Sequence, residues 1–248
     1  MDDTIRNERL AVLIDAENIS YAAIDDIFSE IASFGTACIK RAYGDWKELN
    51  EKWKDMLRKH GIKAEQNFHF TQNKNSSDIA FVIEAMDLLH AKNLDGFCIV
   101  SSDSDFTHLA RRIRESGLKV YGFGEMKTPE ALTNACDKFI FIENLRNDIV
   151  SQDDSNSQLD KDEQEKLHKI FQEVILAINP DGEEVYLGNL GHHINNKYPS
   201  FDVRSYGFKG LGKLVDSLPF LELIELPEKS KGAAKAYNVK LKYKTLKK

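Results

Sequence analysis

Short apolar runs alternate with longer segments of helical period through the first 146 residues, and this alternation constrains the fold more than any other feature. Each run suits one buried strand, and each intervening segment suits a crossover helix. Strands joined in this way lie parallel in one sheet, with helices on both faces. We therefore predict a three-layer α/β domain with a parallel sheet, whose strands lie at residues 10–14, 37–43, 62–68, 97–100, 119–123 and 139–142.

The segments between the runs predict helices at residues 22–33, 46–60, 78–91, 106–116 and 129–136. Gly35, Gly61 and Gly117 each follow one of these segments, where a left-handed residue commonly ends a helix. We expect all three glycines to be helix stops. Residues 78–91 are apolar almost all round, which indicates a helix packed deeply beside the sheet.

Residues 147–164 separate two parts of the chain that differ in charge. This stretch is rich in Asp, Ser, Asn and Gln, so it cannot bury enough apolar surface to offset its ordering entropy. We interpret it as an acidic, flexible linker between a first domain at residues 1–146 and a second at 165–248. The whole chain has a net charge of -6, whereas residues 164–248 hold 14 basic and 10 acidic residues.

The second part reads as a small domain of helices that ends in a hairpin. Residues 167–178 have helical period and meet the turn signal Asn179-Pro180-Asp181-Gly182. Two apolar runs follow at 221–226 and 237–241, which suit the two strands of a β-hairpin. This pattern predicts a winged-helix domain with a lysine-rich tail.

Composition and motifs exclude several classes of protein. No apolar run approaches the roughly 18–20 residues that cross a bilayer, and the charged start MDDTIRNERL lacks a signal segment, so we expect a soluble, cytoplasmic protein. Cys38, Cys98 and Cys136 are widely spaced, which indicates reduced core residues rather than disulfides or a zinc site. Dinucleotide, P-loop and GxSxG motifs are absent from the sequence.

Two predicted strands run directly into carboxylates. Asp15 follows the first strand, and Asp103 and Asp105 follow the fourth. Parallel strands end at one edge of the sheet, and neighbouring strands lie about 4.8 Å apart. If these two strands are neighbours, the three carboxylates share a small volume, and Asp78 at the start of the apolar helix can complete the cluster.

Clustered carboxylates repel one another unless a divalent cation neutralises them. An all-oxygen site of this kind suits Mg²⁺ or Mn²⁺. Such ions can activate a water and stabilise the charge that develops on a phosphodiester. The cluster therefore predicts metal-dependent phosphodiester hydrolysis.

Each acidic residue also has a simpler explanation. Asp78 could complement a helix dipole, and Asp103 and Asp105 could cap the helix that begins at Phe106. Asp15 is harder to explain, because a carboxylate that ends a buried strand is costly without a partner. Residues 103–107 also match the DxDxT pattern of haloacid-dehalogenase-type phosphatases, which need a lysine and further acids downstream, where only about two predicted strands remain.

Five segments share their order and spacing with a known family: LIDAENI (13–19), AYGDW (42–46), KNSSDIAFVIEAMDLL (74–89), IVSSDSDFTHLARRIRESGLKVYGFG (99–124) and TPEALTNACDKFIFIE (128–143). Together they resemble an NYN domain, a PIN-like (Rossmann-like) nuclease fold. The resemblance implies a metal-dependent ribonuclease with Asp15, Asp78, Asp103 and Asp105 as its catalytic and metal-binding residues. Asn18 matches the polar partner of the first aspartate, and Ser101 or Ser102 lies where a hydroxyl could contact ligand or backbone.

Residues 185–226 resemble a LOTUS domain, also called OST-HTH, through Leu187, Leu190, Gly191, Pro199-Ser200-Phe201-Asp202, Arg204, Tyr206-Gly207 and Leu214. This resemblance implies binding of RNA, including structured or G-rich RNA, or docking to a protein partner. The candidates for phosphate contact are Arg204, Lys209 and Lys213, with the lysine-rich end at Lys240, Lys242, Lys244, Lys247 and Lys248. Phe201, Tyr206 and Phe208 could instead be core or turn residues with no role in binding, and we interpret Phe201 as a core residue.

The leading hypothesis is an RNA endonuclease whose second domain supplies or recruits the substrate. The residues expected near the RNA in the first domain are Asn18, Arg41, Lys74, Ser101, Ser102 and Arg111. The alternative is a non-catalytic RNA-binding or scaffold protein that retains the nuclease fold. A small-molecule phosphatase is a third hypothesis, although such an enzyme has no obvious need of a basic second domain.

Overall fold

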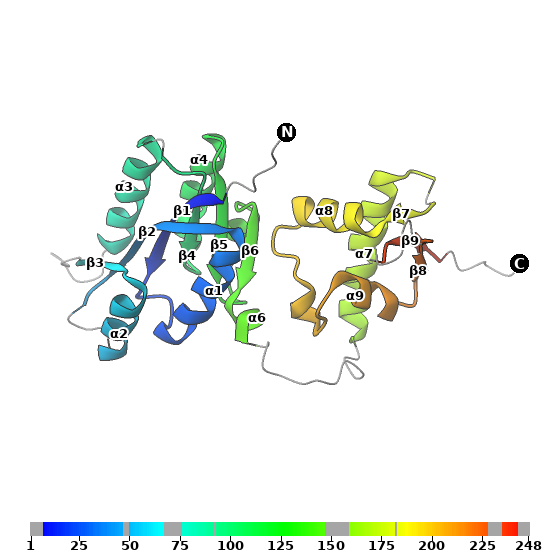
Figure 1. Ribbon diagram of the computed structural model, residues 1–248, viewed down its shortest axis with the longest axis horizontal. Helices are drawn as coiled ribbons and strands as arrows, with labels where there is room; N and C mark the ends of the chain where they lie inside the picture. Colours follow the sequence, from blue (N-terminus) through cyan, green and yellow to red (C-terminus); the bar gives the residue numbers. More distant parts are fainter. Residues whose placement is uncertain are drawn as a thin grey trace, which may run out of the picture. The chain divides into compact units, whose positions relative to one another are not determined.

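The computed structural model describes residues 7–46, 50–66, 76–91, 93–146, 159–181, 183–227 and 235–242. The chain forms two compact units, Met1–Asp148 and Ile149–Lys248, and both are drawn in Figure 1. Each unit has its own hydrophobic core. Over the described ranges, no helix has the length and apolar character to cross a membrane.

One sheet of six parallel strands forms the centre of the first unit, in the order β3-β2-β1-β4-β5-β6. All six predicted strands are confirmed, as β1 (Glu8–Asp15), β2 (Gly35–Gly44), β3 (Lys63–Gln66), β4 (Gly96–Val100), β5 (Lys119–Gly124) and β6 (Lys138–Phe141). β1 and β4 are neighbours, with Leu13 opposite Ile99 and Ile14 opposite Val100. The strand order reverses between these two strands, because β2 and β3 lie on one side of β1, and β4, β5 and β6 lie on the other. In α/β sheets, ligands bind beyond the carboxyl ends of the strands at such a switch point.

Helices cover both faces of this sheet (Figure 1). On one face, α1 (Ile24–Phe34), α2 (Glu51–His60) and α6 (Ile142–Arg146) pack around a core that includes Val12 and Val100. On the other, α3 (Ser76–His90), α4 (Thr107–Glu115) and α5 (Glu130–Thr133) pack around a core that includes Leu13 and Ile99. The predicted three-layer α/β fold is therefore confirmed. Short 3-10 helices, η1 (Tyr21–Ala23) and η2 (Ser104–Phe106), lead into α1 and α4.

Helix α3 packs through one face only. Phe81, Ala85 and Leu89 are buried against the sheet, at the four-residue spacing of one helical face. Ile79 and Ile83 are 61% and 57% exposed. The prediction that this helix is deeply packed is thus correct for one side, because the sheet covers a single face of it.

Two of the three glycines end helices as predicted. Gly61 and Gly117 have φ values of 62° and 83° and follow α2 and α4. Gly35 has an extended φ of 177° and begins β2, so its prediction as a left-handed helix stop was wrong. A Cβ at Gly35 would lie 2.3 Å from the carbonyl oxygen of Glu8, so this glycine allows the close approach of β1 and β2.

The three cysteines are all free thiols. Cys98 and Cys136 are buried, as predicted, whereas Cys38 is exposed. The pairing of β1 with β2 jumps from Ala37 to Ile39, so Cys38 occupies an irregularity of the ladder. A bulged residue of this kind lies outside the regular alternation of the strand, which explains its exposure.

Helices followed by a small antiparallel sheet form the second unit: α7 (Lys161–Ile178), β7 (Val185–Tyr186), α8 (Leu187–Lys197), η4 (Val203–Tyr206), α9 (Leu211–Ser217), β8 (Leu221–Glu225) and β9 (Tyr237–Leu241). The strands have the order β7-β9-β8, with both pairs antiparallel. This arrangement fits the predicted winged-helix fold. The short strand β7 was not predicted, because two residues are too few to show a period.

Helix α7 begins inside the stretch that the sequence analysis assigned to the linker. Asp160 and Glu163 form a reciprocal capping box, in which the Glu163 N–H donates to Asp160 Oδ1 at 2.8 Å and the Asp160 N–H donates to Glu163 Oε2 at 3.0 Å. Residues 161–164 therefore belong to the helix. Residues 147–158 of the predicted linker lie outside the described residues.

Candidate metal centre

Asp15 ends β1 and is almost completely buried, with 3% of its surface exposed. Its Oδ2 accepts hydrogen bonds from Asn18 Nδ2 at 2.7 Å and from Ser101 Oγ at 2.8 Å. Its Oδ1 accepts two longer bonds of 3.3 Å from the backbone N–H groups of Glu17 and Asn18. Burial raises the pKa of Asp15, and these hydrogen bonds oppose the rise. Since its bonds are long, Oδ1 is the oxygen that retains capacity for a further partner.

Ser101 and Ser102 are both engaged within the protein. Ser101 is fully buried, and its hydroxyl donates to Asp15 and accepts a 3.1 Å hydrogen bond from the Asp103 N–H. The Ser102 hydroxyl accepts from the Glu125 N–H at 2.8 Å. Ser101 thus positions Asp15 and Asp103, and Ser102 contacts the backbone, which is one of the two contacts expected of these hydroxyls.

Asp103 caps η2. Its Oδ1 accepts a 2.8 Å hydrogen bond from the Asp105 N–H, which confirms the capping role considered for this residue. None of the described residues donates a hydrogen bond to its Oδ2. Asp103 can therefore cap the helix with one oxygen and bind another group with the second.

Asp78 lies in the first turn of α3, and its pKa is raised to about 6. Burial is the largest cause, followed by the negative charges of Asp15, Asp103, Glu17 and Asp105. Like charges raise the pKa of a carboxyl group in this way when they lie near it. The fold thus gathers all four predicted acidic residues, with Glu17 as a fifth, at the carboxyl edge of the sheet.

Glu17 is the member of this acidic cluster that the sequence analysis did not assign to the site. Its Oε1 accepts a 3.1 Å hydrogen bond from the Asp45 N–H, just after β2, and its Oε2 accepts a 3.2 Å bond from the Ser77 hydroxyl. Glu17 therefore ties the turn after β1 to β2 and to the first turn of α3, next to Asp78. Its place two residues after Asp15 was the available signal in the sequence.

The donor set of the acidic cluster suits a hard divalent cation. In the described part of the chain, no three acidic, histidine or cysteine side chains already have the spacing of a metal coordination shell. Mg²⁺ keeps several waters and often takes only one or two carboxylates directly. The oxygen capacity at Asp15 and Asp103, with the charge repulsion on Asp78, fits Mg²⁺ or Mn²⁺ held partly through water.

The basic residues expected near the site have different environments. Arg41 pairs with Glu84 on α3 and, at 3.6 Å, with Glu65 on β3. With only 21% of its side chain exposed, Arg41 links β2, β3 and α3 through these ion pairs. Arg111 is exposed on α4, and Lys74 lies outside the described residues.

In the second unit, Arg204 forms an ion pair with Asp202. Its Nε and Nη2 donate to the Asp202 carboxylate at 2.9 Å and 2.7 Å, and this pair stabilises the turn at η4. Arg204 thus has a local role in this turn. Lys209 and Lys213 are exposed. Lys240 and Lys242 are described, whereas Lys244, Lys247 and Lys248 lie outside the described residues.

The aromatic residues of the second unit contribute to its core. Phe201, Tyr206 and Phe208 are partly buried against the core residues. The ring of Phe201 lies 6.2 Å from that of Phe171, in an edge contact. The interpretation of Phe201 as a core residue is confirmed.

Two family models match the chain, one for each unit. Residues 9–143 match the NYN domain, and residues 159–232 match the OST-HTH/LOTUS domain. An uncharacterized protein of Methanocaldococcus jannaschii is 30% identical over 139 residues, which cover 54% of this chain and 55% of that protein. The chain thus spans about half the length of this relative. A crystal structure of a protein of unknown function from Vibrio parahaemolyticus matches 56% of this chain and 94% of its own, at 20% identity and a TM-score of 0.46.

The NYN match covers more than half of the chain, and it includes β1 to β6 except for the first residue of β1. The NYN domain is a PIN-like nuclease family, and the LOTUS domain is an RNA-binding module, so the pair supports a role in RNA cleavage or RNA binding. The chain belongs to the NYN-domain family, and an OST-HTH/LOTUS domain follows its NYN domain.

Proposed function

We propose that this protein is an endoribonuclease that hydrolyses RNA phosphodiester bonds and depends on Mg²⁺ or Mn²⁺. The observation that carries the proposal is that Asp15 and Asp103 meet at one point, where the Ser101 hydroxyl donates to Asp15 Oδ2 and accepts from the Asp103 N–H. That point lies beyond the carboxyl ends of β1 and β4, where an α/β sheet binds its ligands.

The proposed metal ligands are Asp15, Asp78, Asp103 and Asp105, directly or through water. A bound Mg²⁺ or Mn²⁺ would supply an activated water and would offset the charge that develops on the phosphate. Asn18 and Ser101 hold the Asp15 carboxylate in place through their hydrogen bonds. Because Ser101 is buried, its hydroxyl is a positioning group and has no access to RNA as a nucleophile.

Glu17 has a positioning role in this proposal. Its two carboxylate oxygens hold Asp45 and Ser77, so they fix the first turn of α3 relative to the ends of β1 and β2. Asp78 is the residue after Ser77, and its carboxyl group therefore depends on this contact for its place in the cluster.

The second domain supplies or recruits the RNA in this proposal, with residues 1–146 as the nuclease domain and 165–248 as the LOTUS domain. Lys209 and Lys213 are the exposed basic residues proposed to contact phosphates. The match to the OST-HTH/LOTUS domain supports RNA as the partner.

Cleavage of a labelled, mixed-sequence single-stranded RNA by the parent protein tests this proposal. We expect internal cuts with Mn²⁺ or Mg²⁺ and none with EDTA. A folded protein that binds the RNA and cuts it with neither metal would be the non-catalytic scaffold instead. Hydrolysis of p-nitrophenyl phosphate, with the RNA left intact, would identify a small-molecule phosphatase.

A further inference from the structure

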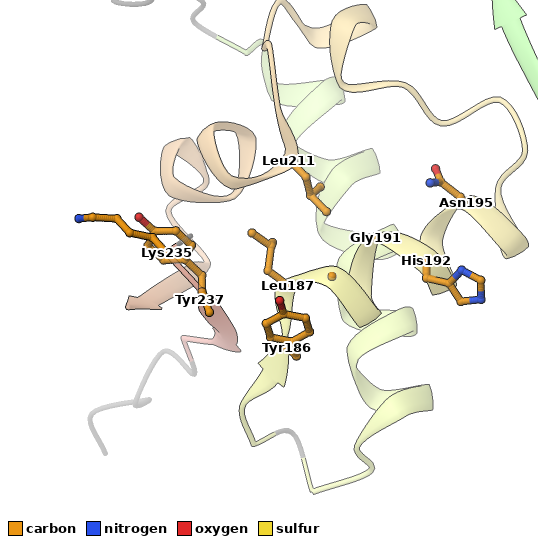
Figure 2. A pocket seen from close by; sticks show the side chains of 10 residues that line it. Tyr186, Leu187, Gly191, His192, Asn195, Leu211, Lys235 and Tyr237 are labelled. Carbon is orange, nitrogen blue, oxygen red and sulfur yellow. The ribbon is translucent and has the colours of Figure 1, made fainter. Parts of the chain in front are cut away.

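A groove of about 460 Å³ lies in the second unit, between the first turns of α8, the start of α9 and the beginning of β9 (Figure 2). Tyr237 and Lys235 lie on one side of it, His192 and Asn195 lie on the other, and Tyr186 lies in the middle beside Leu187. Leu187 and Leu211 lie between the two sides. The groove thus combines aromatic and aliphatic surface with a few polar groups, which is the usual character of a small-molecule binding site.

The middle of the groove offers an uncovered aromatic ring. Tyr186 is 48% exposed, which is unusual for so large a side chain in this protein. Among the described residues, neither the Tyr186 hydroxyl nor the Asn195 amide has a hydrogen-bond partner. The groove therefore combines an uncovered ring with two polar groups that have no partner among the described residues.

Two glycines of α8 keep the groove open. A Cβ at Gly188 would lie 2.7 Å from the ring of Tyr186, and a Cβ at Gly191 would lie 3.0 Å from Leu211 Cδ2. Glycine within a helix is less favourable than alanine. Both glycines lie on the face of α8 where a methyl group would push Tyr186 or Leu211 out of its present position.

The charge of the groove favours an anionic ligand. None of the described residues that line it is acidic, although the chain as a whole has a net charge of -6. Lys235 extends to the outside of the groove, where its Nζ lies 2.8 Å from Glu225 Oε1. Both side chains are at least half exposed, and such a surface pair contributes little, so the ammonium group can exchange to a phosphate.

We infer that this groove binds one unpaired nucleotide of a single-stranded RNA, with its base against Tyr186 and its phosphate toward Lys235. The inference rests on the proposed RNA function and assigns a nucleotide site to the LOTUS domain. Stacking on an aromatic ring accepts every base, because each base has a π-face. The Asn195 amide can both donate and accept, so it can pair with the edge of the stacked base.

Fluorescence anisotropy of the full chain in EDTA tests this site, because EDTA withholds the metal that cleavage needs. The probes are an end-labelled single-stranded RNA and an oligomer of the same length that has abasic units in place of its nucleosides. We expect Tyr186→Ala to weaken binding of the RNA by about 5- to 100-fold and to leave binding of the abasic oligomer unchanged. Tyr186→Trp keeps an aromatic surface and should retain RNA binding.

His193→Ala is the matched control, because His193 is exposed on α8 next to His192 and does not line the groove. It should leave RNA binding unchanged. Equal RNA affinity of the parent and Tyr186→Ala would overturn the inference. That result is expected if the groove binds a peptide instead of RNA. An equal loss with both oligomers would also overturn it, since the tyrosine would then act through the fold. Failure of the nuclease proposal appears separately, as a lack of cuts with metal.

Discussion

The Ser101 hydroxyl donates a 2.8 Å hydrogen bond to Oδ2 of Asp15, from the end of β4 to the end of the neighbouring strand β1. Both residues are buried, and the same hydroxyl accepts from the Asp103 N–H. Ser101 therefore holds in place two acidic residues, Asp15 and Asp103, that follow different strands. The relative positions of Asp15 and Asp103 therefore depend on the Ser101 hydroxyl as well as on the pairing of β1 with β4.

Ser101→Ala should lower the free energy of unfolding by about 1–3 kcal/mol, because the buried Asp15 carboxylate loses a donor. It should also weaken Mn²⁺ binding, since Asp15 and Asp103 lose their shared support. Urea denaturation and Mn²⁺ titration measure the two effects. Ser102→Ala is the control, because it removes only the bond from the Glu125 N–H. Equal Mn²⁺ affinity of Ser101→Ala and the parent would contradict this role.

Asp78 should make the metal-free protein less stable at neutral pH. Its folded pKa of about 6 lies above the ordinary value of 3.8, so the fold favours the protonated form. The resulting penalty is absent below pH of about 4, grows as the pH rises through 6, and is fully present above it. Asp78→Asn should therefore stabilise the metal-free protein by on the order of 1 kcal/mol at neutral pH, a value reduced for solvent screening.

Thermal unfolding in EDTA at pH of about 4 and 7.5 checks this prediction. The stabilisation by Asp78→Asn should appear only at the higher pH. Asp55→Asn changes an exposed carboxylate on α2 and should show no such dependence. An Asp78→Asn variant that is less stable than the parent at neutral pH would contradict the raised pKa of Asp78.

Glu17 should act through its hydrogen bonds rather than through its charge. Glu17→Gln keeps one oxygen for the Asp45 N–H and places an amide near the Ser77 hydroxyl, so it should retain most of the RNA cleavage. Glu17→Ala removes both contacts and should lower cleavage by about 10- to 100-fold, as loss of an outer-shell partner does. Single-turnover cleavage rates compare the two variants. An equal loss in both would assign Glu17 to the metal-binding set.

Arg41 and Glu84 should stabilise the fold without contributing to RNA affinity. Their partly buried side chains form an ion pair, so removing one partner leaves an unpaired charge beneath α3. Arg41→Met should cost about 1–3 kcal/mol, and adding Glu84→Leu should restore part of the loss. A double-mutant cycle by urea denaturation measures this coupling. A large drop in the RNA affinity of folded Arg41→Met would show that Arg41 contributes to RNA binding.

The sequence predicted the sheet well, because its strands are continuous apolar runs and the acidic residues follow them directly. That pattern is sufficient to place Asp15 and Asp103 at one edge of the sheet. It did not show the function of Gly35, because the same residue after a helix can supply either a left-handed turn or space for a neighbouring strand. The close approach of Glu8 decides between the two.

The directions of polar side chains could not be predicted. Arg41 reads as a phosphate contact in the sequence, and only the fold shows that Glu84 lies within its reach. Ser101 likewise reads as a hydroxyl at the site, and its burial assigns it to Asp15. Contacts between segments far apart in the chain determine such roles, and one sequence does not contain them.

Cleavage of single-stranded RNA with Mn²⁺ by Asp103→Asn, beside the parent and Asp55→Asn, tests the central claim most directly. Asparagine caps a helix as well as aspartate does, so this substitution keeps the bond from the Asp105 N–H, removes the charge and replaces the second oxygen with an NH₂ group. We expect a loss of at least about 100-fold in cleavage rate for Asp103→Asn, unchanged RNA binding, and parental activity for Asp55→Asn. Cleavage at the parental rate by Asp103→Asn would contradict the assignment of catalysis to the acidic cluster.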